Sequence, residues 1–143
     1  MIAEIPTIAT ILRQHEHSVT KARQVVFNAL ADSGPLTMAQ LTNKVRAHID
    51  RTSVYRTVDL FEKLGIINRL QIGWKYKLEL SDLFTEHHHH ATCMQCGSVI
   101  SLEEDESLET GIQHLAASAD FTISSHTLEI RGICSSCKHN AKT

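Results

Sequence analysis

Residues 50–80 read DRTSVYRTVDLFEKLGIINRLQIGWKYKLEL, a helical pattern that gives way at one glycine to a strand pattern. In its first half, apolar side chains recur at helical spacing, at Val54, Val58, Phe61 and Leu64. This spacing predicts a helix over 52–64 with one apolar face. The helix should end at Gly65, because glycine is a typical C-terminal cap. Residues 66–80 form two strand-like runs around a turn at Gly73, which predicts a β-hairpin.

Three further helical patterns precede this stretch, the first a short one over 8–14. Thr20 can cap a helix over 21–34, which a glycine–proline pair ends. Thr37 can cap a third helix over 38–49. Short helices followed by a hairpin predict a winged helix-turn-helix domain, in which the helix over 52–64 is the recognition helix.

The surface of the predicted recognition helix is suited to DNA. The side chains near its start and away from its apolar face include Arg51, Ser53, Tyr55 and Arg56. An α-helix fits the major groove, and Arg, Lys, Ser and Tyr all contact phosphates. Lys75 and Lys77 on the hairpin suit a wing that lies against the DNA backbone. The alternative is a small helical domain whose hairpin only covers the core.

The formal net charge of −2 over 143 residues conceals two segments of opposite charge. Residues 21–77 hold ten Lys and Arg against four Asp and Glu, a net charge of +6. The remaining four basic and twelve acidic residues give −8. A basic helix-turn-helix segment favours a nucleic-acid partner, and the opposite signs indicate two domains. We expect a DNA-binding domain over 1–80, a hinge over 81–86 and a second domain over 87–143.

Composition and motifs exclude several other classes of protein. No apolar run approaches the length of about 18 residues that a membrane span needs. The first residues lack the layout of a secretory signal, so we expect a cytoplasmic protein that does not bind membranes. A hydrophobic content of 42% argues against disorder. No H-E-x-x-H or similar motif is present, so an enzyme such as a zinc hydrolase is not expected.

Two C-x-x-C pairs, Cys93/Cys96 and Cys134/Cys137, lie in the second half of the chain. A two-residue spacer lets both sulfurs face one ion, and two pairs supply the four thiolates of a closed structural Zn²⁺ site. Two disulfides, a redox dithiol and an iron–sulfur cluster are the alternatives, of which disulfides are disfavoured without a secretory signal. A region of roughly 55 residues is also too small to be stable without a metal or a partner chain.

Four consecutive histidines, His87 to His90, run directly into the first cysteine pair. Neighbouring side chains of an extended chain point to opposite faces, so His87 and His89 should face one way and His88 and His90 the other. The run can therefore serve two metal sites, since imidazole binds Zn, Fe, Ni and Cu. A solvated histidine patch is the alternative.

Residues elsewhere in the chain could complete these two sites. Glu109, on a predicted helix, and His126, on a strand predicted over 121–133, could join His87 and His89. Glu79, at the end of the hairpin, could join His88 and His90 in a site that spans the two domains. Spacing alone does not choose Glu109 over the neighbouring acids Glu103, Glu104 and Glu106.

The order of these motifs resembles the Fur family of bacterial metal-responsive transcriptional regulators, which respond to iron, zinc, manganese or peroxide. The resemblance extends from about residue 8 to residue 138. It rests on VT-x-x-R at 19–23, TSVYRTVDLFEKLGII at 52–67, HHHH-x-x-C-x-x-CG at 87–97, Glu109, His126 and the final C-x-x-C. It implies an α+β protein with an N-terminal winged helix and a C-terminal α/β domain that forms a homodimer.

The resemblance also implies a role for each candidate residue. The structural zinc site consists of Cys93, Cys96, Cys134 and Cys137. A second metal site consists of His87, His89, Glu109 and His126. The interdomain sensing site includes Glu79, His88 and His90. Tyr55 and Arg56 correspond to operator contacts, with Arg23 and Lys75 near the phosphates.

Three places depart from the family pattern. His89 stands where the family motif HHHDH has Asp. Pro35 and Leu36 stand where iron-sensing members supply a histidine ligand, and Ser101 stands where they supply an acid. The sensing site is therefore the part of the chain that departs most from iron-sensing relatives.

Motifs and resemblance together predict a repressor that binds a palindromic operator as a dimer when loaded with a regulatory divalent metal, Fe²⁺ or Zn²⁺, with Mn²⁺ as a third candidate. Three imidazoles and a carboxylate favour zinc at the second site. No substrate other than metal ions is expected. The alternatives are a peroxide-responsive Fur-type regulator and a His-rich metal-storage or chaperone module, which would leave the basic segment without a role.

Overall fold

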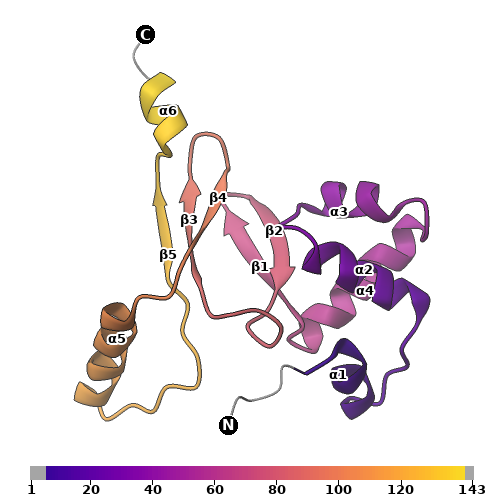
Figure 1. Cartoon of the computed structure of the whole chain (residues 1–143), viewed down its shortest axis with the longest axis horizontal. Helices are drawn as coiled ribbons and strands as arrows, with labels where there is room; N and C mark the ends of the chain where they lie inside the picture. The colour runs from indigo at the N-terminus through magenta and orange to yellow at the C-terminus, as the bar shows by residue number, and fades with distance from the viewer. Residues whose placement is uncertain (1–5, 141–143) are drawn as a thin grey trace. The chain divides into compact units, whose positions relative to one another are not determined.

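The computed structural model describes residues 6–140 and divides the chain into two compact units between Glu86 and His87. The N-terminal unit contains α1 (Ile8–Gln14), α2 (Lys21–Ala31), α3 (Met38–Val45), α4 (Arg51–Lys63), β1 (Ile67–Ile72) and β2 (Lys75–Leu80), as Figure 1 shows. The C-terminal unit contains β3 (His89–Cys93), β4 (Val99–Leu102), α5 (Glu106–Ser118), β5 (Glu129–Gly132) and α6 (Ser135–Asn140). This mixed architecture confirms the predicted α+β fold class. Within residues 6–140, no helix is long and apolar enough to cross a membrane.

The helices of the N-terminal unit begin at polar caps that the sequence supplies. Thr20 and Asp50 each accept a first-turn amide, at the starts of α2 and α4. Thr37 and Gln40 form a reciprocal capping box, in which each side chain accepts the other residue's backbone N–H. Helix α3 ends at Val45 and not at the predicted residue 49, because the chain turns at 46–48.

The apolar faces of these helices meet in one core, which the hairpin closes. Its largest fully buried side chains are Leu12, Val26, Leu41, Val54, Val58, Phe61, Ile66 and Leu78. Burying each such side chain contributes about 1.5–3 kcal/mol. Leu36 forms an antiparallel bridge with Leu78, which ties the segment before α3 to the hairpin. In Figure 1, α2, α3 and α4 gather on one side of β1 and β2.

The hairpin has the predicted position and a tight turn. Strands β1 and β2 pair in register from Ile67 opposite Leu80 to Ile72 opposite Lys75. The turn therefore consists of Gly73 and Trp74 alone. Gly73 has φ +62, a left-handed conformation that glycine adopts without steric cost.

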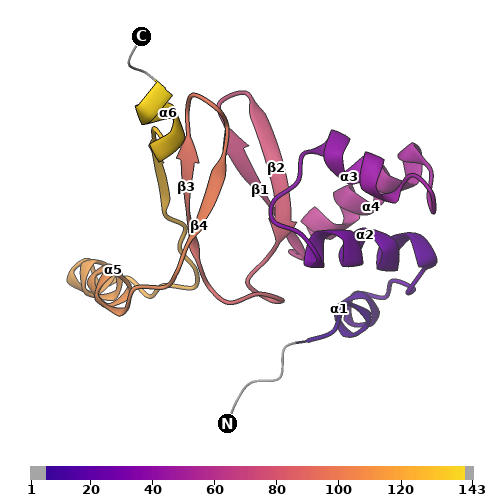
Figure 2. The ribbon, with the colours of Figure 1, turned by 45° about the horizontal axis from the view of Figure 1, so that its top comes forward.

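The C-terminal unit is a three-stranded sheet in the order β4-β3-β5, with β3 in the centre (Figure 2). Strand β4 is antiparallel to β3, and β5 is parallel to it. The parallel register places Cys93 opposite Gly132, two residues before Cys134. A long connection through α5 is needed, because parallel neighbours cannot be joined by a tight turn.

One strand prediction in this unit was wrong. The predicted strand over 121–133 is limited to β5, because β3 offers ladder partners only to Glu129–Gly132. His126 therefore lies in the irregular segment before β5 and not on a strand. The second half of the histidine run, which the sequence predicts to be extended, begins β3.

The described part of the C-terminal unit, residues 87–140, contains no buried aliphatic side chain. Within residues 87–140, the buried side chains are His89, His90, Thr92, Cys93 and Cys137. Four of these five are candidate metal ligands. Apolar side chains such as Ile100, Leu115 and Phe121 are half or more exposed. The buried side chains described in this unit are therefore mainly candidate metal ligands.

Candidate metal centres and nucleic-acid interface

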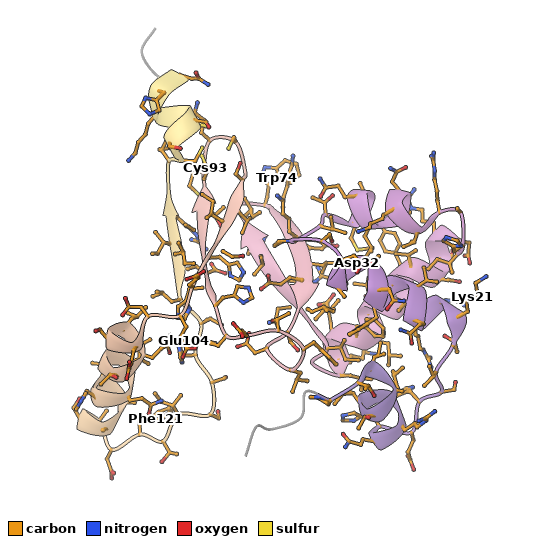
Figure 3. All side chains as sticks on the ribbon, in the orientation of Figure 1. Lys21, Asp32, Trp74, Cys93, Glu104 and Phe121 are labelled. Carbon is orange, nitrogen blue, oxygen red and sulfur yellow. The ribbon has the colours of Figure 1, made fainter. Side chains whose placement is uncertain are left out.

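The four cysteines converge at the end of the C-terminal sheet. Cys93 ends β3, Cys96 lies in the following turn, Cys134 follows β5, and Cys137 is on α6. Their Sγ atoms all lie within 4.8 Å of one another, and no disulfide joins them. Figure 3 shows Cys93 below α6, the helix that contains Cys137. The parallel β3–β5 pairing thus brings two pairs that are far apart in sequence to one point.

The backbone around Cys93 favours a thiolate there. Backbone amides, first that of Cys134 and then that of Cys96, lower the pKa of the Cys93 thiol to about 6. By contrast, the Cys134 side chain, burial and the other thiols raise the pKa of Cys137. Four thiolates at this spacing repel one another unless a cation lies among them.

The sulfur spacing fits zinc. Sγ of Cys96 lies 3.8 Å from Sγ of Cys134. In a tetrahedral site with Zn–S bonds of about 2.3 Å, sulfurs lie about 3.8 Å apart. The four residues therefore fit a closed structural Zn²⁺ site.

A second cluster gathers three imidazoles around one carboxylate. His89 Nε2 lies 2.6 Å from Oε1 of Glu109, and His87 Nε2 lies 3.3 Å from the same oxygen. His126 Nε2 lies 2.8 Å from the other carboxylate oxygen, Oε2. Hydrogen bonding to His89, with the nearby His126 and His87, lowers the pKa of Glu109. The four ligand atoms lie within 4.8 Å of one another and fit a divalent cation.

The position of Glu109 on α5 distinguishes it from the other three acids that spacing could not separate, of which Glu106 is on the same helix and Glu103 and Glu104 precede it. Glu103, Glu104 and Glu106 are exposed, whereas the Glu109 side chain is only 17% exposed. It faces His89, whose side chain is 3% exposed. Locating this ligand required the docked position of the helix, which a single sequence does not provide.

His88 and His90 form a separate pair, as alternation along an extended chain predicts. Their ring centroids are 4.7 Å apart, and His90 is buried. Ser101 lies directly opposite His90 in the β3–β4 ladder. Glu79 is on β2 in the N-terminal unit, opposite Asn68. Its assignment to one site with His88 and His90 stays a prediction.

The start of α4 carries most of the residues predicted to bind DNA. Arg51, Tyr55 and Arg56 are exposed, and the Arg51 guanidinium lies 5.6 Å from the centroid of the Tyr55 ring. Ser53 is engaged in capping: its hydroxyl donates to Oδ1 of Asp50 at 2.6 Å, and its amide donates to Oδ2 at 3.2 Å. These bonds, the side-chain bond first, lower the pKa of Asp50.

A hollow between α3 and α4 adds residues that sequence reasoning missed. Its lining consists of Ala39, Thr42, Asn43, Arg46, Arg51 and Tyr55. Arg46 lies within the basic segment 21–77, and this charge pattern is the sequence signal that could have pointed to it. Thr42 and Asn43 could be recognised only from the packing of the two helices, which turns these side chains toward the start of α4.

Two residues outside α4, Arg23 and Lys75, are also predicted to contact phosphates. The Arg23 guanidinium donates to the backbone oxygen of Ser18, so this side chain also holds the segment before α2. Lys75 is exposed at the start of β2, and its Nζ lies 4.9 Å from the centroid of the Trp74 ring.

The sequence of the chain matches the ferric uptake regulator family over residues 14–131. This chain belongs to that family. The match confirms the resemblance noted in the motifs. It covers α2 to α4, both hairpin strands, every residue of the two histidine-containing clusters, and the first cysteine pair, Cys93 and Cys96. The second cysteine pair lies beyond its last residue, so the complete sulfur site emerges from the geometry of this Fur-family chain and not from the family match.

Similar Fur-family proteins extend over nearly the whole chain. A ferric uptake regulation protein of Campylobacter upsaliensis is 29% identical over 141 residues, which span 92% of this chain and 87% of that protein. A peroxide-responsive repressor PerR of Staphylococcus saprophyticus is 27% identical over 151 residues, 96% of this chain and 99% of that protein. Among solved structures, the Helicobacter pylori ferric uptake regulator Fur, which has three functional metal binding sites, aligns with a TM-score of 0.77. The alignment has 23% identity, covers 96% of this chain and 97% of that one, and shows the shared fold.

Proposed function

We propose that this Fur-family regulator is a metal-dependent repressor that binds a palindromic operator as a homodimer. The observation that carries the proposal is the composition of the C-terminal interior, where four of the five buried residues are candidate metal ligands. A unit built in this way depends on metal for its order. The basic N-terminal unit supplies a recognition helix with exposed Arg51, Tyr55 and Arg56.

The proposed metal sites have different roles. Cys93, Cys96, Cys134 and Cys137 would hold a structural Zn²⁺, which as a closed four-thiolate centre contributes folding energy and no catalysis. His87, His89, Glu109 and His126 would hold a second ion. Three imidazoles and one carboxylate, with His89 in place of an acid, favour Zn²⁺ there.

The proposed regulatory ligands are Glu79, His88 and His90. Glu79 belongs to the N-terminal unit and the two histidines to the C-terminal unit. Sharing ligands in this way would restrict the motion of one unit against the other about the connection at 81–86. Units whose motion is restricted in this way would hold the two recognition helices of a dimer at a fixed spacing. Metal binding would thereby be coupled to DNA binding. Fe²⁺, Zn²⁺ and Mn²⁺ are the candidate regulatory ions.

A peroxide-responsive regulator is the second candidate function. The similarity to a peroxide-responsive repressor over 96% of the chain favours it. Exposing the metal-loaded protein to hydrogen peroxide distinguishes the two functions. Loss of DNA binding at low peroxide with iron, but not with zinc, assigns the peroxide response.

The variant His90→Ala tests the proposed switch. We expect it to keep the unfolding transition of the wild type and to lose the dependence of DNA affinity on added metal. The matched control is His114→Ala, because His114 is an exposed histidine of the same unit outside the three clusters. A His90→Ala protein whose DNA affinity still rises with metal as in the wild type refutes the assignment.

A further inference from the structure

The hairpin carries a side chain that the proposed DNA contacts do not include. Trp74 is the single tryptophan of the chain, and it is 86% exposed. Among the large hydrophobic residues described, it is the most exposed. A tryptophan in this position contributes nothing to the core, whereas exposed tryptophans often supply a large share of binding energy in interfaces.

The turn presents Trp74 at the apex of the hairpin. The last paired residues are Ile72 and Lys75, so only Gly73 and Trp74 form the turn. Gly73 has positive φ and Trp74 does not, the pattern of a type II′ turn with glycine first. Glycine has no side chain, so Trp74 is the single side chain of the apex, as Figure 3 shows at the turn end of the hairpin. The side-chain amide of Gln71 donates to the backbone oxygen of Gly73 at 2.9 Å and stabilises this turn.

The surroundings of Trp74 are basic. The Lys75 ammonium lies 4.9 Å from the centroid of the indole ring, within the range of a cation–π contact. Lys77 follows two residues later on the same strand. An aromatic plane beside fixed positive charge is complementary to a polyanion that also has flat apolar surfaces, and nucleic acid has both features.

We propose that Trp74 is a DNA-contacting residue of the wing. Its indole packs against the sugar and base surface of the duplex beside the groove that α4 occupies, while Lys75 neutralises a neighbouring phosphate. Aromatic and apolar side chains at such positions stack on or wedge against bases, and their contribution depends little on sequence. The inference rests on the proposed DNA-binding function and adds to it a residue outside the recognition helix.

The single tryptophan allows a direct test by fluorescence. The probe is a duplex of about 30 base pairs, long enough for two half-sites one helical turn apart, selected from a randomised pool with Zn²⁺-loaded protein. We expect saturating duplex to change the indole emission and to protect it from the collisional quencher acrylamide. Unchanged emission and quenching at saturation, while anisotropy of the labelled duplex reports binding, overturn the inference and leave the proposed function intact.

Variants separate the roles of the ring and the charge. We expect Trp74→Ala to weaken binding about five- to tenfold, since loss of one stacked aromatic side chain has an effect of this order, without changing the salt dependence. Trp74→Phe should recover most of the affinity. Lys75→Ala should reduce the slope of log affinity against log salt by about one phosphate contact. Lys63→Ala, an exposed lysine at the end of α4, is the control.

Three other results overturn the inference. One is a Trp74→Ala protein that binds the duplex as tightly as the wild type. Another is an emission change that follows protein concentration without DNA, which would place Trp74 in contact with a second copy. A wild-type protein that binds no duplex with any of the three metals contradicts the proposed function together with this inference.

Discussion

Removing the proposed structural zinc should unfold the C-terminal unit and leave the N-terminal unit folded. The perturbation is chelation, or the variant Cys96→Ser, which removes one of the four sulfurs at the end of the sheet. The N-terminal unit has its own aliphatic core and no cysteine, so its stability should not respond. The expected result is that the C-terminal unit alone unfolds.

The expected magnitude follows from what the C-terminal unit buries. An ordinary domain of roughly 55 residues has a free energy of unfolding of about 3–8 kcal/mol. This unit lacks buried aliphatic side chains within residues 87–140, so its intrinsic stability lies below that range. A structural Zn²⁺ in a small domain contributes about 10–16 kcal/mol at neutral pH. The expected loss therefore exceeds the stability that the unit's own buried side chains supply.

Hydrogen exchange measured by mass spectrometry resolves the two units. We expect the amides of β3 and β5 to lose protection on chelation, while those of α4 keep it. Met94→Ser is the matched control for Cys96→Ser, because Met94 is an exposed residue of the same turn that is not a candidate ligand. Protection of β3 that persists after measured removal of all zinc refutes the reasoning.

Three further predictions concern the N-terminal unit. Phe61→Ala should lower the free energy of unfolding by about 3–5 kcal/mol in urea denaturation, because Phe61 is fully buried in the core. The pKa of Asp50 lies below its ordinary value of 3.8, so its stabilising effect is present above that value and is lost as the pH falls further. Asp50→Asn should therefore flatten the fall in urea midpoint below about pH 4. Arg56→Ala should weaken duplex binding about tenfold and reduce its salt slope by about one, as fluorescence anisotropy can measure.

Each of these predictions has a contradicting outcome. A change below about 1 kcal/mol for Phe61→Ala would mean that the core is loosely packed. If the urea midpoint of Asp50→Asn falls with acid as much as that of the wild type, the ionised Asp50 cap does not stabilise α4. For Arg56→Ala, an affinity equal to that of Lys63→Ala would place the DNA contacts elsewhere.

The parts of the fold that local chemistry determines could be predicted from the sequence. Helix α4 follows from its apolar spacing and its Asp50 cap, and the hairpin follows from the strand-like runs around Gly73. The pairing of His87 with His89 and of His88 with His90 follows from alternation along an extended chain. These features depend on a few neighbouring residues.

Features that depend on docking between distant segments could not be predicted. Residues 121–128 alternate like a strand but have no ladder partner, so β5 is limited to Glu129–Gly132. The choice of Glu109 over Glu106 depends on how α5 lies against the sheet. Likewise, Thr42 lines the hollow beside α4 only because α3 and α4 pack together. The site of Glu79 with His88 and His90 stays a prediction.

Titration of DNA affinity with metal tests whether metal binding controls DNA binding. Protein that retains one zinc per chain is titrated with Fe²⁺, Zn²⁺ or Mn²⁺ while anisotropy reports its affinity for the selected duplex, and elemental analysis counts the bound ions. We predict at least a tenfold rise in affinity with metal beyond the first equivalent, which corresponds to a coupling of about 1.4 kcal/mol. Equal affinity with and without the added metal, at confirmed occupancy, would contradict the account.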